Sequence, residues 1–261
     1  MDYAPEERKD KKLAQLKSQI QDHETIGPYI DILDDSFLSG FLHGKKYDLD
    51  ATITCLENYI RIRTVKYRKH MQPYRPSSEV MLDTLLIRFL KNKDQHGRIV
   101  AVLQYESWDP AVQTAQQVLA TTMFVADEAI RSLFPNCADI VSIIDCKSFS
   151  FAHLRQINFN IMVQTIELCF KCVPSRPKAL HMVNENKLLA GIIKIVRSLL
   201  PNKIRDRYHC HSYNLDSLHE HVPRSILPES LGGVLTDEEA YDHELIANVK
   251  KNDKFYDKIV Q

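Results

Sequence analysis

The stretch that decides the fold is "ADIVSIIDCKSFSFAHLRQINFNIMVQTIELCFKCVPSRPKALHMVNE", residues 138–185. It begins with "ADIVSIIDC", a nearly continuous apolar run that predicts a buried strand. The next segment, "INFNIMVQTIELCFKC", predicts a helix, and "KALHMVNE" predicts another strand. Strands that alternate with helices of this length are typical of a parallel or mixed sheet covered by helices.

The preceding residues extend this α/β pattern. The β-branched run "RIVAVLQYES", residues 98–107, predicts a strand that follows a tight turn at Gly97. In "WDPAVQTAQQVLATTMFVADEAIRSLF", residues 108–134, Asp109 is a residue type that caps helices and Pro110 one that favours the first helical position. We therefore expect a long helix to begin at this pair.

The first third of the chain has a different, helical character. Good helix formers mix with charges in "RKDKKLAQLKSQIQDH", residues 8–23, and residues 36–70 carry apolar side chains at helical spacing in two segments split by Gly44. Two prolines and two serines make "MQPYRPSS", residues 71–78, the expected linker. We predict a helical lobe (1–75), an α/β lobe (76–240) and a C-terminal helical tail (241–261).

Composition limits the classes of function. The 34 basic residues balance the 34 acidic ones, so no overall field would attract nucleic acid. The charged N-terminus has no apolar stretch of signal length, and no run reaches the roughly 18 apolar residues of a membrane span. The six cysteines are expected to be reduced and mostly buried. These features predict a cytoplasmic protein that contacts membranes only peripherally.

Catalytic groups are scarce in the sequence. Only seven glycines occur, and neither G-x-G-x-x-G nor G-x-x-x-x-G-K-[ST] is present, which disfavours a nucleotide enzyme. No serine lies in G-x-S-x-G. Asp145 ends a predicted strand, where it could be an acid or base but is better interpreted as a cap for the next turn. We expect neither enzymatic activity nor a cofactor.

Two patterns could bind a metal. Cys169 and Cys172 form a C-x-x-C pair without a second such pair, so core thiols are the favoured interpretation. The segment "HCHSYNLDSLHEH" contains His209, His211, His219 and His221, but no cysteine or carboxylate is specified to complete a ligand set. We expect solvated or hydrogen-bonded histidines there, and no metal.

The segment Lys187–Leu200 predicts an amphipathic helix with a broad apolar face and a basic polar arc. It is too short to cross a bilayer, and further basic residues precede and follow it. Composition alone leaves two interpretations open: a helix packed on a sheet with a solvated basic face, or a helix that meets anionic lipid headgroups.

Five segments, in their order and spacing, resemble the CRAL-TRIO lipid-transfer family. They are "SFLSGFLHGKKYDLDATITCLENYIRIR", "SWDP", "IVSIIDCKSFSFAHLRQI", "SRPKALHMVNE" and "LPESLGG". The resemblance implies an α/β fold in which an all-helical N-terminal lobe precedes a lobe whose mixed β-sheet floors an apolar cavity. It further implies that "NKLLAGIIKIVRSLL", residues 186–200, is a mobile gate helix over that cavity.

The resemblance also implies site residues. Matching strands and helices nominates, for the cavity, Leu103, Tyr105, Leu119, Thr122, Ala126, Ile140, Ile144, Phe151, Ile157, Thr165, Leu168 and Leu180, and, for the gate, Leu189, Ile192, Ile193 and Val196. Plain core packing is the alternative for each cavity residue. Thr122 and Tyr105 could hold one hydroxyl or carbonyl of a ligand. The family's phosphoinositide-contacting positions fall on Lys45, Arg176, Lys178, Lys203 and Arg207.

The function implied is that of a monomeric cytoplasmic carrier, which moves a tocopherol, retinoid, carotenoid or similar lipid between membranes and docks on phosphoinositides. A phosphoinositide-binding regulatory module without cargo is the alternative. The chain departs from the family pattern at Ser148, where related proteins usually carry glycine, at Leu231, where they carry tyrosine, and at residues 197–199, "RSL" in place of "KPF". These departures leave the identity of the cargo open.

Overall fold

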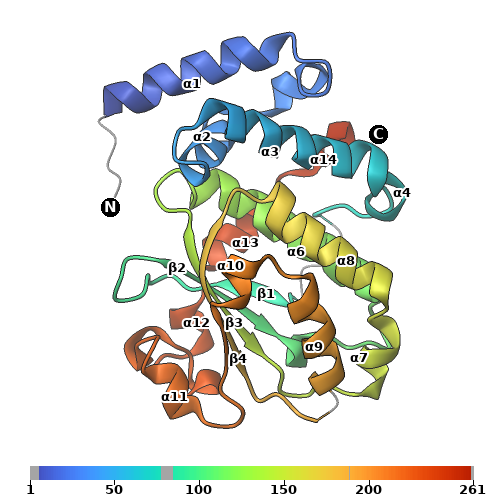
Figure 1. The fold of residues 1–261 in the computed structure, drawn as a ribbon, viewed down its shortest axis with the longest axis vertical. Helices are drawn as coiled ribbons and strands as arrows, with labels where there is room; N and C mark the ends of the chain where they lie inside the picture. The colour runs from blue at the N-terminus through green and yellow to red at the C-terminus, as the bar shows by residue number, and fades with distance from the viewer. Residues whose placement is uncertain (1–5, 78–84, 188, 260–261) are drawn as a thin grey trace.

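A computed structural model describes residues 6–77, 85–187 and 189–259. Ser78, the last residue of the expected linker, and Leu188 of the expected amphipathic helix lie outside these ranges. Figure 1 shows a layer of N-terminal helices at one end of the molecule and a sheet flanked by helices at the other. This arrangement confirms the predicted fold class.

The sheet has five strands in the order β1-β2-β3-β4-β5, with β1 antiparallel to β2 and the other neighbours parallel. The strands are β1 (Ile87–Phe89), β2 (Ile99–Gln104), β3 (Asp139–Asp145), β4 (Arg176–Val183) and β5 (Tyr208–Cys210). The apolar run that begins at residue 138 forms the central strand β3. Helices cover both faces of the sheet, so this strand buries side chains on both of its faces, which explains why its sequence is almost continuously apolar. Strand β1 was not expected from the sequence.

The N-terminal layer contains the helices expected there. They are α1 (Glu6–Gln21), the 3₁₀ helix η1 (Gly27–Ile32), α2 (Asp35–Gly44), α3 (Leu49–Arg61), the π-helical turn η2 (Ile62–Lys66) and α4 (Arg68–Met71). The side chains of Asp34 and Asp48 cap α2 and α3, and α2 ends at Gly44 as predicted. A Cβ atom on Gly44 would lie 1.9 Å from the carbonyl oxygen of Pro174, so only glycine allows this close contact with the segment before β4.

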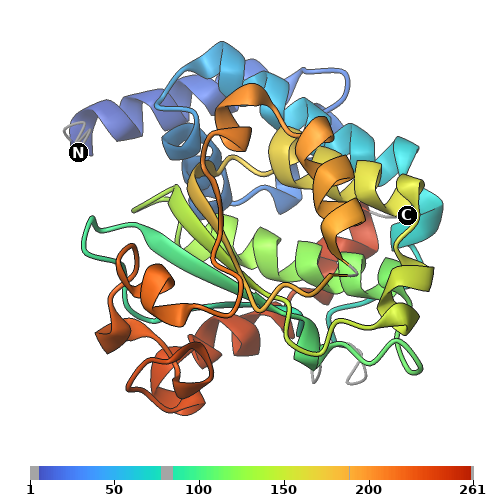
Figure 2. The ribbon, with the colours of Figure 1, turned by 60° about the horizontal axis from the view of Figure 1, so that its bottom comes forward.

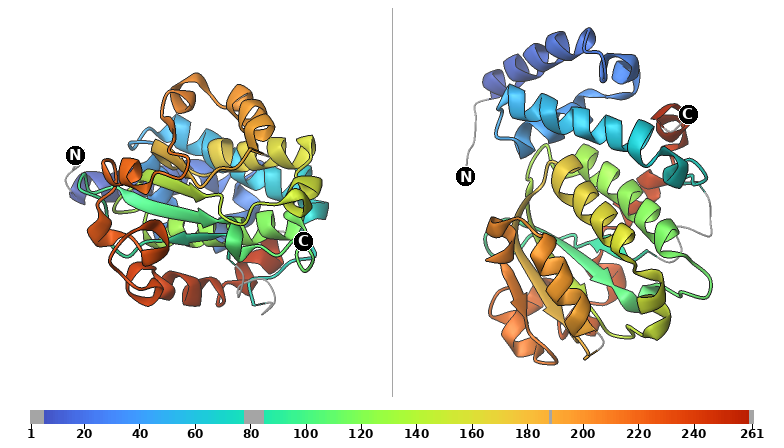
Figure 3. Two further views of the ribbon diagram at one scale, coloured as in Figure 1. Left: turned by 90° about the horizontal axis from the view of Figure 1, so that it is seen from below. Right: turned by 45° about the vertical axis from the view of Figure 1, so that its right-hand side comes forward.

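Helices lie on both faces of the sheet, as the further views in Figures 2 and 3 show. On one face lie α6 (Ala115–Ser132), α8 (Phe159–Glu167) with its π-helical extension η4 (Leu168–Cys172), and α9 (Leu189–Leu199). On the other lie α11 (Leu215–His219) and α12 (Asp237–Ala240). Short elements connect them: η3 (Tyr105–Ser107), α7 (Phe151–Gln156), α10 (Asn202–Arg205), η5 (Arg224–Ile226) and η6 (Glu229–Leu231).

The long helix α6 begins later than the sequence predicted. It starts at Ala115, and Thr114, not Asp109, is its N-cap, in a capping box with Gln117. Asp109 and Pro110 belong to a separate turn, in which Asp109 Oδ1 accepts a hydrogen bond from the backbone N–H of Ala111. The capping box satisfies amide donors from both directions, and this local bonding outweighs the preference of Pro110 for the first helical position.

The C-terminal tail is part of the main core. Helix α13 (His243–Val249) packs on α6, and α14 (Asp253–Ile259) packs against η1. Their buried side chains, Leu245, Val249, Phe255, Tyr256 and Ile259, join the apolar cluster that also contains α2, α3 and α6. The tail therefore connects the N-terminal layer to the α/β unit. The domain boundaries given above stay predictions.

Candidate functional site: a cavity beneath α9

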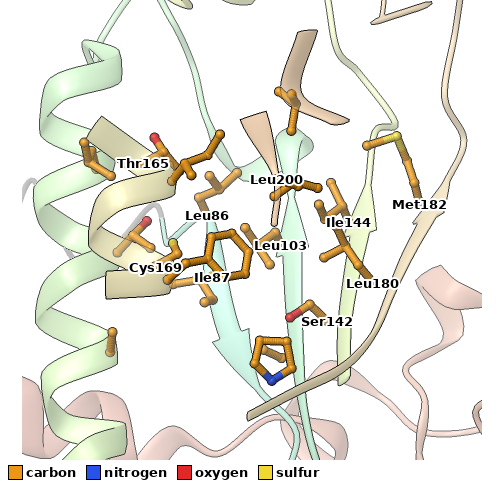
Figure 4. Close-up of a pocket in the computed structure, with 18 of the residues that line it drawn as sticks. Leu86, Ile87, Leu103, Ser142, Ile144, Thr165, Cys169, Leu180, Met182 and Leu200 are labelled. Atoms are coloured by element: carbon orange, nitrogen blue, oxygen red, sulfur yellow. The ribbon is translucent and has the colours of Figure 1, made fainter. Parts of the chain in front are cut away.

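A cavity of about 340 Å³ lies between the sheet and the helices α6, α8 and α9. Its floor follows from strand alternation, because every second side chain faces it. Ala101 and Leu103 face it from β2, Ser142 and Ile144 from β3, and Leu180 and Met182 from β4. Figure 4 shows Leu103, Ser142, Ile144 and Leu180 on adjacent strands beside the same space. The intervening residues, such as Val102 and Ile143, pack in a second core behind the sheet.

Helix α9 covers the cavity with the apolar face that the sequence predicted. Leu189, Ile192, Ile193 and Val196 line the space below it. The opposite side of α9 carries Lys194, Ile195 and Arg197, which are exposed. The segment is therefore an amphipathic helix whose inner face is apolar and whose outer face is partly basic, and its role as a gate stays a prediction.

Fourteen of the sixteen nominated residues line this cavity. They are Leu103, Tyr105, Leu119, Thr122, Ala126, Ile140, Ile144, Ile157, Thr165, Leu180, Leu189, Ile192, Ile193 and Val196. Whether they bind a ligand stays a prediction.

The two other nominated residues do not line the cavity. Phe151 is the first residue of α7 and its side chain is 62% exposed, while Phe149, two residues earlier, is buried against Tyr105. Leu168 is buried in the core shared with the N-terminal helices. On the α8 helix it lies just outside the arc that faces the cavity, which is centred on Thr165 and Cys169.

The lining residues that were not nominated from the sequence include Ser142 and Met182 on the floor and three further groups. These groups are Leu86, Ile87 and Phe89 around β1, the α8–η4 residues Ile161, Met162, Ile166, Cys169 and Phe170, and Tyr208 of β5. The α8 group carried a usable signal, since Ile161 and Cys169 lie one helical turn on either side of the nominated Thr165. Strand β1 is only three residues long and gave no such signal.

Few polar groups face the cavity, and they differ in what they can offer a ligand. Thr122 Oγ1 donates to the carbonyl of Val118 and Thr165 Oγ1 to that of Ile161, each at 2.8 Å, so both oxygens can only accept from a ligand. The Tyr105 hydroxyl and Ser142 Oγ form no hydrogen bond with any residue the structure describes. Burial raises the pKa of the Tyr105 phenol, so this hydroxyl stays protonated and can donate.

The five nominated basic residues gather around the N-terminal end of β4, and we call them the basic rim. Arg176 Nη1 donates to the carbonyl of His43 in α2 at 2.8 Å, and Lys45 follows the C-terminal end of that helix. Arg207 donates to the carbonyl of Pro177 and also lines the cavity. Lys203 lies exposed on α10, which packs against β4. The rim therefore borders the cavity at this end of the sheet.

One carboxylate partly neutralises the basic rim. Asp139 pairs with Arg176 and, at 3.2 Å, with Lys178. Partial burial opposes ionisation of Asp139, but hydrogen bonds and charge from Arg176 and Lys178 outweigh it and hold its pKa below the usual value. Lys203 forms no ion pair within the described ranges, so part of the positive charge is available to an anionic partner.

Among the candidate catalytic and metal residues, only Cys169 lines the cavity. Asp145 Oδ1 accepts from the backbone N–H of Lys147 at 3.0 Å and from Asn184 Nδ2 at 2.8 Å, which agrees with its interpretation as a turn cap. All six cysteines are free thiols, and burial raises the pKa of Cys169 to about 11. Over residues 6–77, 85–187 and 189–259, no group of three or more potential ligands is arranged to hold a metal ion.

Comparisons with known proteins agree with this architecture. The chain is 30% identical over 208 residues to a Mus musculus protein named alpha-tocopherol transfer protein-like, covering 79% of this chain and 60% of that protein. It is 27% identical over 221 residues to Clavesin-2 of Mus musculus, covering 83% of this chain and 68% of the relative. The chain thus spans about 60% of the length of the tocopherol-named relatives it matches.

A solved structure shares the fold of this chain, and a family model identifies its family. The crystal structure of Sfh5 superimposes with a TM-score of 0.59 over 98% of this chain and 100% of Sfh5, at 12% identity, a likeness of fold. No described helix is long and apolar enough to cross a membrane. Residues 84–233 match the family model described as the CRAL/TRIO domain. The chain therefore belongs to the CRAL/TRIO domain family, as the resemblance in its sequence predicted.

Proposed function

We propose that this protein carries an apolar lipid in the cavity beneath α9 and transfers it between membranes. The observation that supports this most directly is an apolar cavity of about 340 Å³ covered by one amphipathic helix. The isolated hydroxyls of Tyr105 and Ser142 suit a cargo with one polar group on a long hydrocarbon body. The cargo we propose is a tocopherol, retinoid, carotenoid or similar lipid, and the name of the tocopherol-transfer-like relatives favours a tocopherol among these.

The energetics of an apolar cargo require a membrane-linked mechanism. Burying ten methylene groups gains about 8 kcal/mol relative to water but almost nothing relative to a bilayer. The carrier therefore competes with membranes for its cargo, and release requires α9 to move at a lipid surface. No bond is made or broken in this proposal, and the carrier is a cytoplasmic monomer that reaches membranes peripherally.

Two surface features beside α9 support membrane docking. The basic rim can attract anionic headgroups such as phosphoinositides, at about 1 kcal/mol for each basic residue near the surface. Phe151 and Phe159 begin α7 and α8 and are 62% and 59% exposed, and Ile195 on the outer face of α9 is 42% exposed. Figure 1 places α7 and α8 next to α9, so these side chains can enter a bilayer close to the lid.

The identity of the cargo is tested by extracting the purified protein with organic solvent and analysing the extract by mass spectrometry. A stoichiometric apolar lipid is expected. An empty cavity together with intact binding to phosphoinositide vesicles would instead support a regulatory module without cargo. In such a module the basic rim alone would bind the membrane.

We expect the basic rim to control membrane encounter and not cargo affinity. Reversal of charge at Lys45, Lys178 and Lys203, which do not line the cavity, should reduce binding to phosphoinositide vesicles and slow transfer, while the dissociation constant of the cargo in solution changes only a few-fold. Reversal at the exposed Lys69 of α4, Lys250 after α13 and Lys254 of α14 is the matched control. Unchanged vesicle binding at low salt, where electrostatic attraction is strongest, would contradict the proposal.

A further inference from the structure

Four histidines form a cluster on the face of the sheet opposite the cavity. His181 lies on β4, His209 on β5, His211 directly after β5, and His221 after α11. The ring centroid of His181 is 5.1 Å from those of His209 and His211 and 5.0 Å from that of His221. His209 and His221 are also stacked, at 5.2 Å. The rings lie roughly face to face, so their nitrogens do not converge on one point.

The hydrogen bonds of this cluster suit neutral imidazoles. His181 Nδ1 and His211 Nε2 are 2.9 Å apart, and His211 Nδ1 lies 2.8 Å from Ser217 Oγ. In the pair of rings one nitrogen must donate and the other must accept. When both rings are protonated, both nitrogens are donors and the bond is lost. His181 is 1% exposed and His211 6% exposed, so water cannot easily replace that bond.

Few compensating charges face the cluster. Arg98, on the turn before β2, disfavours protonation of His181 and is itself paired with Asp94 at 2.6 Å. Glu185, after β4, and Glu220, after α11, favour protonation of His211. Ser217 is the hydrogen-bond partner from α11. No carboxylate forms an ion pair with a ring of the cluster within the described ranges.

The titration of the cluster couples acid to opening. Burial first, and then the neighbouring histidines and Arg98, lower the pKa of His181 to about 3. Burial first, and then histidine neighbours, also lower the pKa values of His209 and His211. In the closed cluster His181, His209 and His211 therefore bind fewer protons than in the open one, where an imidazole titrates near 6.5. The stability of the closed cluster is complete above this pH and falls as the pH drops below it.

The two strands that hold the cluster also hold the cavity and its lid. Leu180 and Met182 flank His181 on β4 and line the cavity. Tyr208 precedes His209 on β5, lines the cavity, and donates to Met182 Sδ at 3.3 Å. Arg197 of α9 lies 5.3 Å from the centre of the Tyr208 ring. Strand β5 lies at the edge of the sheet and has β4 as its single neighbour, so it can separate without breaking another strand pair.

We propose that the cluster of His181, His209, His211 and His221 is an acid-sensitive latch. Its protonation at mildly acidic pH separates β5 and α11 from β4, moves Tyr208 away from the cavity and α9, and so favours release of the cargo. The release of cargo rests on the carrier function proposed above. The opening of the latch does not.

Hydrogen exchange of the cargo-free protein, followed by mass spectrometry between about pH 7.5 and about pH 5 and corrected for intrinsic rates, tests the latch. If opening takes up one proton, the equilibrium constant for opening of peptides from β5, α11 and α9 should increase about tenfold for each unit by which the pH falls. His209→Gln with His211→Gln should reduce this pH dependence. His96→Gln, on the exposed turn before β2, should leave it unchanged. Wild-type opening that does not depend on pH, or an unchanged dependence in the double variant, would overturn the latch.

A second readout uses retinol, a fluorescent lipid alcohol that does not titrate in this pH range. Its transfer to neutral phosphatidylcholine vesicles should be several-fold faster at about pH 5 than at about pH 7.5 in the wild type and in His96→Gln, but not in the double variant. If acid opens β5 and α11 but hydrogen exchange in α9 and the rate of retinol release do not change with pH, the proposed coupling between the latch and α9 is wrong. If retinol does not bind at any pH, retinol is excluded as the cargo, the lipid found by solvent extraction replaces it in this assay, and hydrogen exchange still decides the latch.

Discussion

Tyr105 presents a hydroxyl without a partner among the described residues to an apolar cavity. Tyr105→Phe removes this hydroxyl and keeps the ring that packs against Phe149 at 5.0 Å. We expect cargo affinity to fall about tenfold, equivalent to one hydrogen bond, with no loss of stability in the cargo-free protein. Fluorescence titration with the extracted cargo and urea unfolding measure the two effects. Unchanged affinity would mean that the polar group of the cargo lies elsewhere.

Ser148 has a backbone conformation that suits glycine. Its φ angle is +69°, in the left-handed region, where a Cβ atom costs about 1–2 kcal/mol. Because glycine also loses more entropy on folding, we expect Ser148→Gly to stabilise the protein by about 0.5–1 kcal/mol in urea unfolding. Ser150→Gly, at an extended position with φ −131°, should give no gain. A destabilised Ser148→Gly variant would show that its side chain has a stabilising role.

These residues also show what the sequence could predict at this scale. The family resemblance nominated Leu103, Ile144 and Leu180, and alternation along β2, β3 and β4 explains why all three line the cavity, since strand geometry fixes their direction. The resemblance did not distinguish Phe151 from Phe149, because both follow β3 near a turn that leads into α7 and whose course depends on the positive φ of Ser148. Side-chain direction in loops follows from tertiary contacts, which one sequence does not specify.

At the scale of elements, α9 is the part whose role is open to a direct test. Ile193 faces the cavity from this helix, so Ile193→Asp places a carboxylate against apolar side chains, at a cost of several kcal/mol unless the helix moves away. We expect weaker cargo retention and stronger adsorption to lipid vesicles. The loss of global stability should be modest, because a movable lid belongs to the less stable part of a fold.

The matched control is Ile195→Asp, on the exposed outer face of the same helix. It should leave cargo retention nearly unchanged and weaken vesicle adsorption. Thermal unfolding of the cargo-free proteins, measured beside a release assay, separates the two roles of α9. A large drop in the stability of Ile193→Asp, with unchanged release from the folded fraction, would mean that α9 is a core helix and not a lid.

Long elements were predictable and short ones were not. Helix α6 has 18 residues and was predicted from the cap signal before it, and α3 has 13 and was predicted from hydrophobic periodicity. Strands β1 and β5 have three residues each and exist because neighbouring strands offer them hydrogen-bond partners. The start of α6 was misplaced because Asp109 and Thr114 are both good caps, and only Thr114 is followed three residues later by a glutamine that completes a capping box.

At the scale of the whole molecule, a buried ion pair joins three distant parts of the chain. Arg63 of η2 donates to Asp127 Oδ1 of α6 at 2.7 Å, and Tyr256 of α14 donates to Asp127 Oδ2 at 2.6 Å. The guanidinium also lies 3.5 Å from the centre of the Tyr59 ring. The side chains of Arg63 and Asp127 are 0% and 2% exposed. This network connects the N-terminal layer, the cavity wall and the C-terminal tail.

Removal of one partner should destabilise the whole molecule, because it leaves the other charge buried and unpaired. We expect Asp127→Asn to lower the free energy of unfolding by about 3–5 kcal/mol, and Arg63→Met to have a similar effect. The double variant should lose less than either single variant, since the desolvation cost of both charges disappears together. Urea unfolding of the four proteins gives the coupling energy. The idea would be contradicted if the loss of stability in the double variant equalled the sum of the two single losses, because the two charges would then not interact. Packing around Tyr59 and Tyr256 would in that case account for the link between the N-terminal layer and the rest of the fold.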